Sequence, residues 1–223
     1  LVRDFLELAY PDRTFYFANV DPFKGKGSGL GLSLLACEQY LQEPFIFLSC
    51  DTLVKELIPK PDHDWMGFSQ IEDLTEYRTL KIASGNVAEI CEKGVIRENL
   101  KGYIGLSGVY SYKKFWQAMH NGETLAIDQG EAYGMKSILE SNNITARSFT
   151  WFDTGNLETI KITQEVYAEP NAPNILEKEN EAIWFIENNV VKFSADNVFI
   201  SNRIKRAQKL KGFVPNINTY KNN

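Results

Sequence analysis

The sequence has few of the residues that build metal centres and disulfide frameworks. Its 223 residues include three cysteines and two histidines, with neither a C-x-x-C spacing nor a histidine pair. We therefore interpret Cys37, Cys50 and Cys91 as small buried side chains of a protein in a reducing, cytoplasmic setting. Long apolar runs are also absent. None approaches the roughly 20 residues that span a bilayer, so we expect no membrane partner.

An excess of positive charge is missing as well. The chain carries 24 Lys and Arg against 29 Asp and Glu, a formal charge of −5, so we expect no nucleic-acid partner. Hydrophobic residues make up 43% and aromatic residues 13% of the chain, which is enough for a sizeable core. The length fits one large α/β domain with a short appendage.

The segment Glu43–Thr52, EPFIFLSCDT, combines an apolar run with an acid at its end. The run at 45–48 predicts a central strand that is buried on both faces, as in parallel sheets covered by helices. Ligands of open α/β sheets bind at the carboxyl ends of such strands. Asp51 is therefore the first candidate site residue.

Strand and helix patterns alternate along the chain. Strand patterns cover 14–20, 65–71, 102–112 and 144–150, and a glycine turn at 84–86 predicts a hairpin of 80–83 with 87–91. Helical patterns cover 1–9, 30–41, 113–121, 128–142 and 157–168, and a short polar helix is expected after Asp51. Because right-handed β-α-β units normally open with a strand, the helix at 1–9 predicts that an earlier strand is missing.

The glycine-rich stretch Lys24–Gly31, KGKGSGLG, directly precedes a helical pattern. Backbone N–H groups in such a loop, together with the partial positive charge of a helix start, suit a phosphate or the edge of a nucleobase. The spacing fits neither G-x-G-x-x-G nor G-x-x-x-x-G-K-[ST]. A flexible surface loop therefore stays open as the alternative.

Two acids, Asp51 and Asp153, each follow an apolar strand pattern and precede a threonine. Carboxylates at neighbouring strand ends could hold a hard cation such as Mg²⁺, which proteins bind through one or two carboxylates and substrate phosphates. The alternative is that each acid caps a following helix. Lys93, after the strand pattern at 87–91, is either a phosphate contact or an ordinary surface lysine.

The C-terminal part of the sequence predicts a separate structural unit. The segment 169–180, rich in Asn, Pro and charge, predicts a linker. Beyond it, 182–186 and 190–194 predict a second hairpin, and 199–210 predicts a helix whose basic residues form a solvated face.

The order of the motifs resembles that of the sugar-1-phosphate nucleotidyltransferases, whose Rossmann-like fold is related to GT-A glycosyltransferases. GSGLGLSLL is similar to the family's base-binding turn and helix, and IFLSCDT is similar to its strand that ends in a metal-binding acid. CEKG is similar to its Glu-Lys-Pro motif, and LSGVYSY is similar to its glycine-bearing strand. WFDTGNLETI is similar to its Trp-x-Asp-x-Gly-Thr-x-Glu motif. The resemblance covers 1–168 and implies an α/β fold with a mixed sheet flanked by helices. A linker at 169–180 and a small hairpin-plus-helix appendage at 181–223 would follow.

The resemblance also implies roles for single residues. Asp51 and Asp153 would bind Mg²⁺ that bridges a nucleoside triphosphate and the incoming phosphate, and Lys93 would contact the phosphate of a phosphorylated small-molecule acceptor. The residues that would border the base are Gly27, Ser28 and Gly29, and those that would meet the acceptor are Glu92 and Gly108.

The sequence departs from the family pattern in three places. The family's opening strand and Gly-x-Gly-Thr-Arg loop have no counterpart from Leu1 onward, so the resemblance implies a truncated domain whose activity by itself is in question. Gly94 stands in place of proline and Asn156 in place of threonine, which leaves the acceptor's identity open.

The segment 181–223 has a second resemblance, to the first hairpin and helix of aminoglycoside- and choline-kinase-like phosphotransferases. Lys192 then stands in the place of the strand lysine that contacts ATP phosphates. The resemblance implies the start of a fused kinase-like domain.

Three hypotheses follow for the function. The first is a nucleotidyltransferase that makes an activated sugar or alcohol, for instance for surface polysaccharide. The second is a GT-A glycosyltransferase, which would need an Asp-x-Asp pair where the sequence has the single acid Asp51. The third is a non-catalytic nucleotide-binding or regulatory module. The first predicts that the carboxylates of Asp51 and Asp153 lie within roughly 4–6 Å of each other, with Lys93 facing the same cleft.

Overall fold

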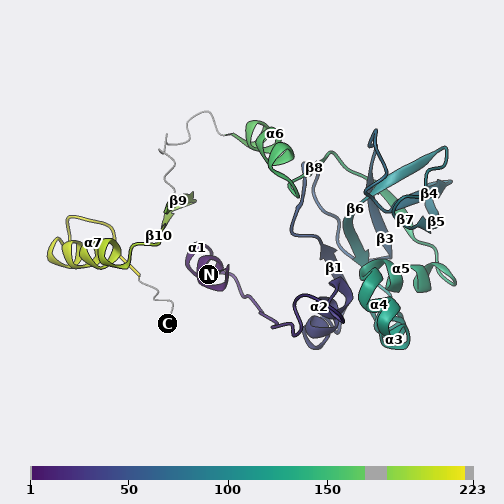
Figure 1. The fold of residues 1–223 in the computed structure, drawn as a ribbon, viewed down its shortest axis with the longest axis horizontal. Helices are drawn as coiled ribbons and strands as arrows, with labels where there is room; N and C mark the ends of the chain where they lie inside the picture. Colours follow the sequence, from purple (N-terminus) through teal and green to yellow (C-terminus); the bar gives the residue numbers. More distant parts are fainter. Residues whose placement is uncertain (1, 169–179, 219–223) are drawn as a thin grey trace. The chain divides into compact units, whose positions relative to one another are not determined.

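A computed structural model describes residues 2–168 and 180–218 (Figure 1). The chain divides into two compact units. Unit 1 is drawn from both ends of the chain, 1–17 and 169–223, and unit 2 is Ala18–Ala168. The first 17 residues thus group with the C-terminal part, whereas the sequence predicts one domain over 1–168. The linker expected at 169–180 lies outside the described residues, apart from Asn180.

Unit 2 is built on a mixed sheet, which confirms the predicted fold class. Among the described residues, six strands lie in the order β1-β6-β3-β7-β5-β4, and β4 also pairs with β6. The pair β3–β7 is parallel, and the other pairs of this sheet are antiparallel. The strands are β1 Phe45–Leu48, β3 Trp65–Ser69, β4 Thr79–Ala83, β5 Asn86–Cys91, β6 Leu100–Val109 and β7 Thr145–Ser148.

Four helices gather on one side of this sheet in the described part of unit 2 (Figure 1). The main core lies between them and the strands, and Phe45 contributes to it by packing edge-on to Phe115 and stacking on Trp116. Alternation along β3 sends Met66 into this core and Trp65 into a second, smaller cluster. The helices are α2 Leu30–Cys37, α3 Tyr112–Asn121, α4 Glu123–Gln129 and α5 Glu131–Leu139.

The strand β1 differs from its prediction in two ways. It lies at the edge of the described sheet and pairs antiparallel with β6, so it is not a central strand among parallel neighbours. Its side chains alternate between buried and exposed, and Ile46 and Leu48 are 40% and 48% exposed. An unbroken apolar run does not reveal this, because the pleat and the covering helices decide which side chains are buried.

The strand predicted over 14–20 is wrong. These residues have no regular structure, and no described strand pairs with them. A β-rich composition produces a strand only where a hydrogen-bonded neighbour is present, and composition cannot reveal that neighbour. The missing strand expected before the helix at 1–9 stays a prediction.

The sequence predicts the β4–β5 turn more accurately than the strand at 14–20. The hairpin of β4 and β5 is confirmed, and it turns at Ser84 and Gly85, whose φ angles are 50° and 78°. The helix predicted over 128–142 is wrong in its limits, because Gly130, with φ of 65°, separates α4 from α5. A non-glycine residue would be strained in that conformation.

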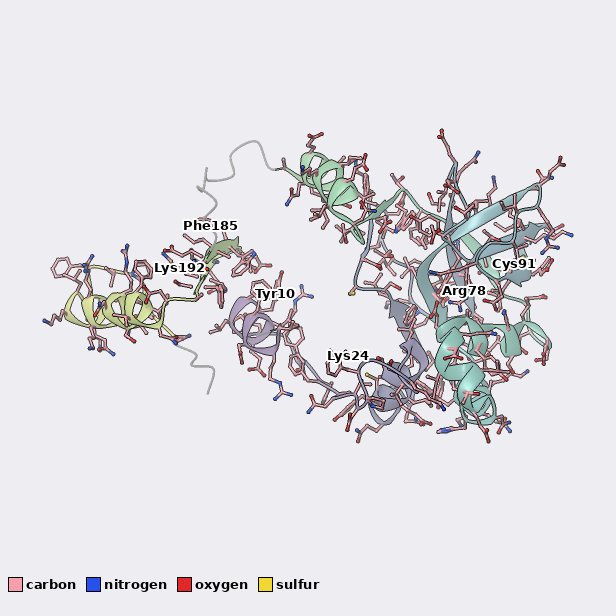
Figure 2. The ribbon with its side chains drawn as sticks, in the orientation of Figure 1. Tyr10, Lys24, Arg78, Cys91, Phe185 and Lys192 are labelled. Atoms are coloured by element: carbon pink, nitrogen blue, oxygen red, sulfur yellow. The ribbon has the colours of Figure 1, made fainter. Side chains whose placement is uncertain are left out.

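Unit 1 combines a helix from the start of the chain with a hairpin and a helix from its end. Phe5 meets Trp184 edge-on, with ring centroids 5.1 Å apart. Lys192, labelled in Figure 2, forms an ion pair of 3.0 Å with Glu181 and lies over the Phe199 ring. The predicted hairpin and helix are confirmed. The elements of unit 1 are α1 Val2–Ala9, β9 Glu181–Ile186, β10 Asn189–Ser194 and α7 Asn197–Lys209.

The structure also bears on the expectations about membrane spans and about the burial of the three cysteines. In the described residues, no helix combines the length and the apolar character that crossing a membrane requires. Cys91 is buried and Cys37 is half-buried, but Cys50 is exposed. The prediction for Cys50 is wrong because it lies in the turn that leaves the edge strand β1.

Candidate functional site

A short two-stranded sheet brings Asp51 and Asp153 together. Where the sequence predicts a polar helix after Asp51, the chain forms β2, Thr52–Val54, which pairs antiparallel with β8, Trp151–Asp153. In this register Thr52 lies opposite Asp153. The backbone carbonyl of Asp51 accepts hydrogen bonds from the N–H and the hydroxyl of Thr154, at 2.9 and 3.1 Å. The two acids therefore belong to one local structure.

Gly155 keeps the space between the two carboxylates open. A Cβ atom at this position would lie 3.0 Å from Oδ1 of Asp153 and 3.5 Å from Oδ2 of Asp51. The distance between Oδ1 of Asp153 and Oδ2 of Asp51 therefore cannot exceed the sum of these two distances. The structure thus brings the two acids close together, and their sharing of one cation stays a prediction.

Neither acid caps a helix. Asp51 is followed by β2, and the helix after Asp153, α6 (Leu157–Tyr167), is capped by Asn156, whose side chain accepts hydrogen bonds from two backbone N–H groups. The capping alternative considered for both acids is therefore wrong.

The donor chemistry suits a hard cation. Asp51 is exposed and Asp153 is half-buried, so both can present oxygen atoms to solvent or to a ligand. The described residues contain no group of three or more His, Cys, Asp and Glu that could hold a metal ion. A cation held by two carboxylates would complete its coordination with water and phosphate oxygens, the usual arrangement for Mg²⁺. The pair thus fits Mg²⁺ together with a phosphate ligand.

Two donors fix the orientation of the Asp153 carboxylate. The hydroxyl of Tyr77 donates to Oδ2 at 3.0 Å, and the backbone N–H of Gly155 donates to Oδ1 at 2.7 Å. Burial and the hydrogen bond to Asp153 raise the pKa of Tyr77 to about 12, so the hydroxyl remains a donor at neutral pH. The Tyr77 ring also packs edge-on against Trp151. The carboxylate is thereby held in one position.

Arg78, the next residue, belongs to a cluster centred on Glu92. Its Nε donates to Oε2 of Glu92 at 3.3 Å, and Nζ of Lys136 contacts Oε1. The register of the hairpin explains this contact, because Thr79 pairs with Cys91; Figure 2 labels Arg78 and Cys91. Burial would raise the pKa of Glu92, but the hydrogen bonds and charges of Lys136 and Arg78 outweigh it and lower that pKa.

Lys93 lies in the turn after β5 and is exposed. The backbone N–H of Gly94 donates to the carbonyl of Thr75 at 3.1 Å, which ties this turn to the loop that carries Tyr77 and Arg78. This hydrogen bond places the backbone of the Lys93 turn next to Thr75. The direction of the Lys93 ammonium group toward a ligand stays a prediction.

A pocket of about 350 Å³ borders Asp153. Ile71, Trp151 and Ile162 give it apolar walls, and Tyr77 also lines it. A volume of this size lies at the lower end of the usual range for small-molecule sites. The pocket offers space for a small organic group next to the paired acids.

Gly27, Ser28 and Gly29 lie directly before α2. Gly27 has φ of 85°, and the Ser28 hydroxyl donates to the carbonyl of Gly25 at 2.7 Å. A Cβ atom at Gly29 would collide with the backbone of Ile127 in α4. Close packing of α2 on α4 therefore explains Gly29, and contact of this turn with a base stays a prediction.

Packing also explains Gly108. A Cβ atom there would collide with the indole ring of Trp65, so the residue must be small for β3 and β6 to pair. Contact between Gly108 and an acceptor stays a prediction. Gly105, with φ of 67°, lies against the side chain of Ser49 at the end of β1, a close approach of the kind that glycines inside a strand indicate.

Nothing in the sequence singles out Tyr77, Arg78 or Lys136. In the sequence these residues look like ordinary members of a charged loop and of a helix surface. The closest to a signal in the sequence was the position of the segment Glu76–Thr79. It leads into β4, and β4 pairs with β5, which ends just before Glu92. Only the side-chain contacts of the folded protein show that Tyr77 reaches Asp153 and that Arg78 and Lys136 reach Glu92.

Comparison with known proteins agrees with this architecture. No family model and no curated protein matches the sequence. A solved structure from Bacillus anthracis, assigned as a glucose-1-phosphate thymidylyltransferase in complex with a sucrose, has a TM-score of 0.63 at 14% identity and covers 78% of this chain and 73% of its own. CTP:phosphocholine cytidylyltransferase from Streptococcus pneumoniae has a TM-score of 0.54 at 12% identity, with coverages of 73% and 72%.

A third similar structure is UTP-bound UGPase from Acinetobacter baumannii. Its TM-score is 0.52 at 19% identity, and the match covers 64% of this chain and 58% of that chain. At these identities the likeness shows the fold, which is the fold of nucleotidyltransferase structures. None of these three structures is described as a kinase, so the fused kinase-like domain stays a prediction.

Proposed function

We propose that this protein transfers a nucleoside monophosphate from a nucleoside triphosphate to a phosphorylated small molecule. The observation that carries the proposal is the pair of converging carboxylates, Asp51 and Asp153, with the space beside Gly155 left open. The fold shared with nucleotidyltransferase structures supports it. The acceptor would be a sugar phosphate or a small phosphorylated alcohol.

The reaction needs little covalent chemistry from the protein. An oxygen of the acceptor phosphate attacks the α-phosphorus of the triphosphate, a new P–O bond forms, and the bond to the β-phosphate oxygen breaks, so that pyrophosphate leaves with the displaced electron pair. Catalysis of such a step comes from positioning and from neutralisation of charge. The residues named below contribute to both.

Asp51 and Asp153 would hold Mg²⁺, which neutralises phosphate charge when it is bound. Tyr77 keeps the Asp153 carboxylate in one orientation, so no freedom is lost when the ligand arrives. Lys93 supplies an exposed positive charge for the acceptor phosphate. The pocket beside Asp153 would accommodate the organic part of the acceptor. A contact of Glu92 with the acceptor is what the family resemblance implies.

The turn before α2 would border the base. Gly27 and Ser28 are in a loop whose backbone can approach a flat ligand, and Gly29 allows the helix to lie close to α4. A base held by backbone groups leaves the identity of the nucleotide open.

Calorimetry with CTP, UTP and TTP, each with and without Mg²⁺, tests the first step. We expect one triphosphate to bind, with an affinity that depends on Mg²⁺. Asp51→Asn and Asp153→Asn should each remove this dependence, because the amide keeps the shape and loses the charge. Asp128→Asn, on the exposed surface of α4, is the matched control and should bind as the unaltered protein does.

Release of pyrophosphate tests the reaction itself. The protein is mixed with the triphosphate that binds and with glucose 1-phosphate or phosphocholine. Pyrophosphate that appears only when the acceptor is present supports nucleotidyl transfer and excludes a glycosyltransferase, which consumes a nucleotide sugar. Absence of any Mg²⁺-dependent triphosphate binding would overturn the proposal.

A further inference from the structure

The pocket beside Asp153 has aromatic and acidic walls. Tyr77 and Trp151 both line it, and their rings meet at a corner, with centroids 5.4 Å apart and planes at 88°. The carboxylates of Glu72 and Asp153 also line it, whereas no lysine or arginine does among the described residues. Aromatic faces and carboxylates both attract positive charge. The walls therefore favour a cationic group.

Two further acids add to the negative charge around this wall. Burial and the hydrogen bond to Asp153 are the main causes of the raised pKa of Tyr77. The charges of Asp73 and Glu76 raise it further, so both carboxylates are close enough to act on the Tyr77 hydroxyl. The pocket and its surroundings thus include the carboxylates of Glu72, Asp73, Glu76 and Asp153.

Lysines also contact residues of the lining. Nζ of Lys101 donates to Oε1 of Gln70 at 3.2 Å, and Nζ of Lys55 lies 5.4 Å from the centroid of the Phe152 ring. Because Phe152 alternates with Trp151 along β8, the contact with Lys55 is on the other face of that strand. These two positive charges are fewer than the carboxylates around the pocket, so the surplus charge there is negative.

The aromatic corner lies next to the proposed cation site. Trp151 and Asp153 are two positions apart on one face of β8, roughly 6.5 Å along the strand. Tyr77 contacts both, because its ring packs against Trp151 and its hydroxyl donates to Asp153. A phosphate ester held through Mg²⁺ at Asp153 would therefore present a group on a short chain to the two rings.

We propose that this pocket recognises an ammonium group, so that the preferred acceptors are phosphate esters of small alcohols that carry a primary or quaternary ammonium. The inference rests on the proposed nucleotidyl transfer and adds the class of acceptor. Trp151 and Tyr77 hold the cation against their rings, and Glu72 offsets its charge. Such an acceptor carries its phosphate at one end and its positive charge at the other, which matches the order of the paired acids and the aromatic corner.

The competing occupant is a neutral sugar. Hydroxyl and amide groups of Ser69, Gln70 and Thr159 also line the pocket, and they could bind the hydroxyl groups of a sugar. A neutral sugar gains nothing from negative charge in the wall, whereas an ammonium group does. Removal of a wall charge therefore distinguishes between the two occupants.

The test uses two pairs of phosphate esters that match in shape and differ in charge. The first pair is phosphocholine and the neutral ester in which a tert-butyl group replaces the trimethylammonium group. The second pair is O-phosphoethanolamine and propyl phosphate. Calorimetry measures each affinity in the presence of Mg²⁺ and an α,β-methylene analogue of the triphosphate that binds, so that no transfer occurs. We expect the ammonium member of at least one pair to bind about tenfold more tightly.

Two substitutions change the charge of the wall. Glu72→Gln keeps the size of the side chain, and it should reduce this preference severalfold without changing the affinity of the neutral esters. Ile162→Lys, at a lining position of α6 that is 55% exposed, adds a positive charge and should also reduce the preference. Glu165→Gln, exposed on α6 but outside the lining, is the matched control and should leave the preference unchanged. Because all three positions are exposed, the fold should be preserved.

The outcomes separate this inference from the proposed function. Equal affinity within both pairs, or a preference that survives both Glu72→Gln and Ile162→Lys, would overturn the inference and leave nucleotidyl transfer in place. Failure of the unaltered protein to bind any triphosphate with Mg²⁺ would overturn both.

Discussion

The hydroxyl of Tyr77 donates a hydrogen bond of 3.0 Å to Oδ2 of Asp153, across 76 positions of sequence. This bond joins the loop before β4 to the end of β8. It fixes one of the two acids that converge beside Gly155. Removing the Tyr77 hydroxyl therefore tests how much this hydrogen bond contributes to ligand binding.

Tyr77→Phe should weaken Mg²⁺-dependent triphosphate binding by about tenfold or more, because a hydrogen bond to a charged group contributes about 1.5–3 kcal/mol. The aromatic contact with Trp151 is kept, so the fold should be preserved. Calorimetry measures the change, and Tyr110→Phe, at an exposed position, is the control. An unchanged affinity would show that Asp153 does not need this donor.

Gly155→Ala should fill the space between the carboxylates. The added methyl group would lie 3.0 Å from Oδ1 of Asp153 and 3.5 Å from Oδ2 of Asp51, so we expect triphosphate binding with Mg²⁺ to fall by about tenfold or more. The neighbouring substitution Asn156→Ala removes the cap of α6 and should cost about 1 kcal/mol of stability without this loss of affinity. If Gly155→Ala binds normally, the shared cation site is wrong.

The buried acid Glu131 should make stability depend on pH. Because burial raises its pKa above the usual 4.5, the folded protein keeps a proton that the unfolded chain releases, and stability falls as the pH rises above that value. Glu131→Gln should therefore gain stability relative to the unaltered protein as the pH is raised from about 4 to about 8.

Denaturant unfolding over this pH range measures the effect of Glu131→Gln. The exposed substitution Glu98→Gln is the control and should show no such trend. A difference between Glu131→Gln and the unaltered protein that stays constant with pH would mean that Glu131 titrates equally in both states.

Asp64 supports α3 rather than the site. Its Oδ1 accepts hydrogen bonds from the backbone N–H groups of Tyr110 and Ser111, both at 2.9 Å, and its Oδ2 accepts one from the Ser111 hydroxyl at 2.6 Å. Asp64→Ala should cost about 2–3 kcal/mol of unfolding free energy. Asp64→Asn, which keeps the Oδ1 acceptor, should cost clearly less. Equal losses in the two variants would contradict this assignment.

The sequence by itself determined the local features of the protein. The hairpin of β4 and β5 follows from strand patterns around Ser84 and Gly85, and the limits of α6 follow from its helical period. The positions of Asp51 and Asp153 at the ends of apolar runs were also visible. These features depend on residues close together in the chain, and backbone geometry limits what such residues can form.

Only the tertiary structure decided how these pieces pair. The apolar run of β1 does not show that it lies at the edge of the described sheet, and nothing near Asp51 shows that β2 pairs with β8. The contacts of Tyr77 with Asp153, and of Arg78 and Lys136 with Glu92, join residues that are separated in sequence. The physical reason is that strand pairing and charge contacts depend on the neighbour that folding supplies, and the local sequence does not name that neighbour.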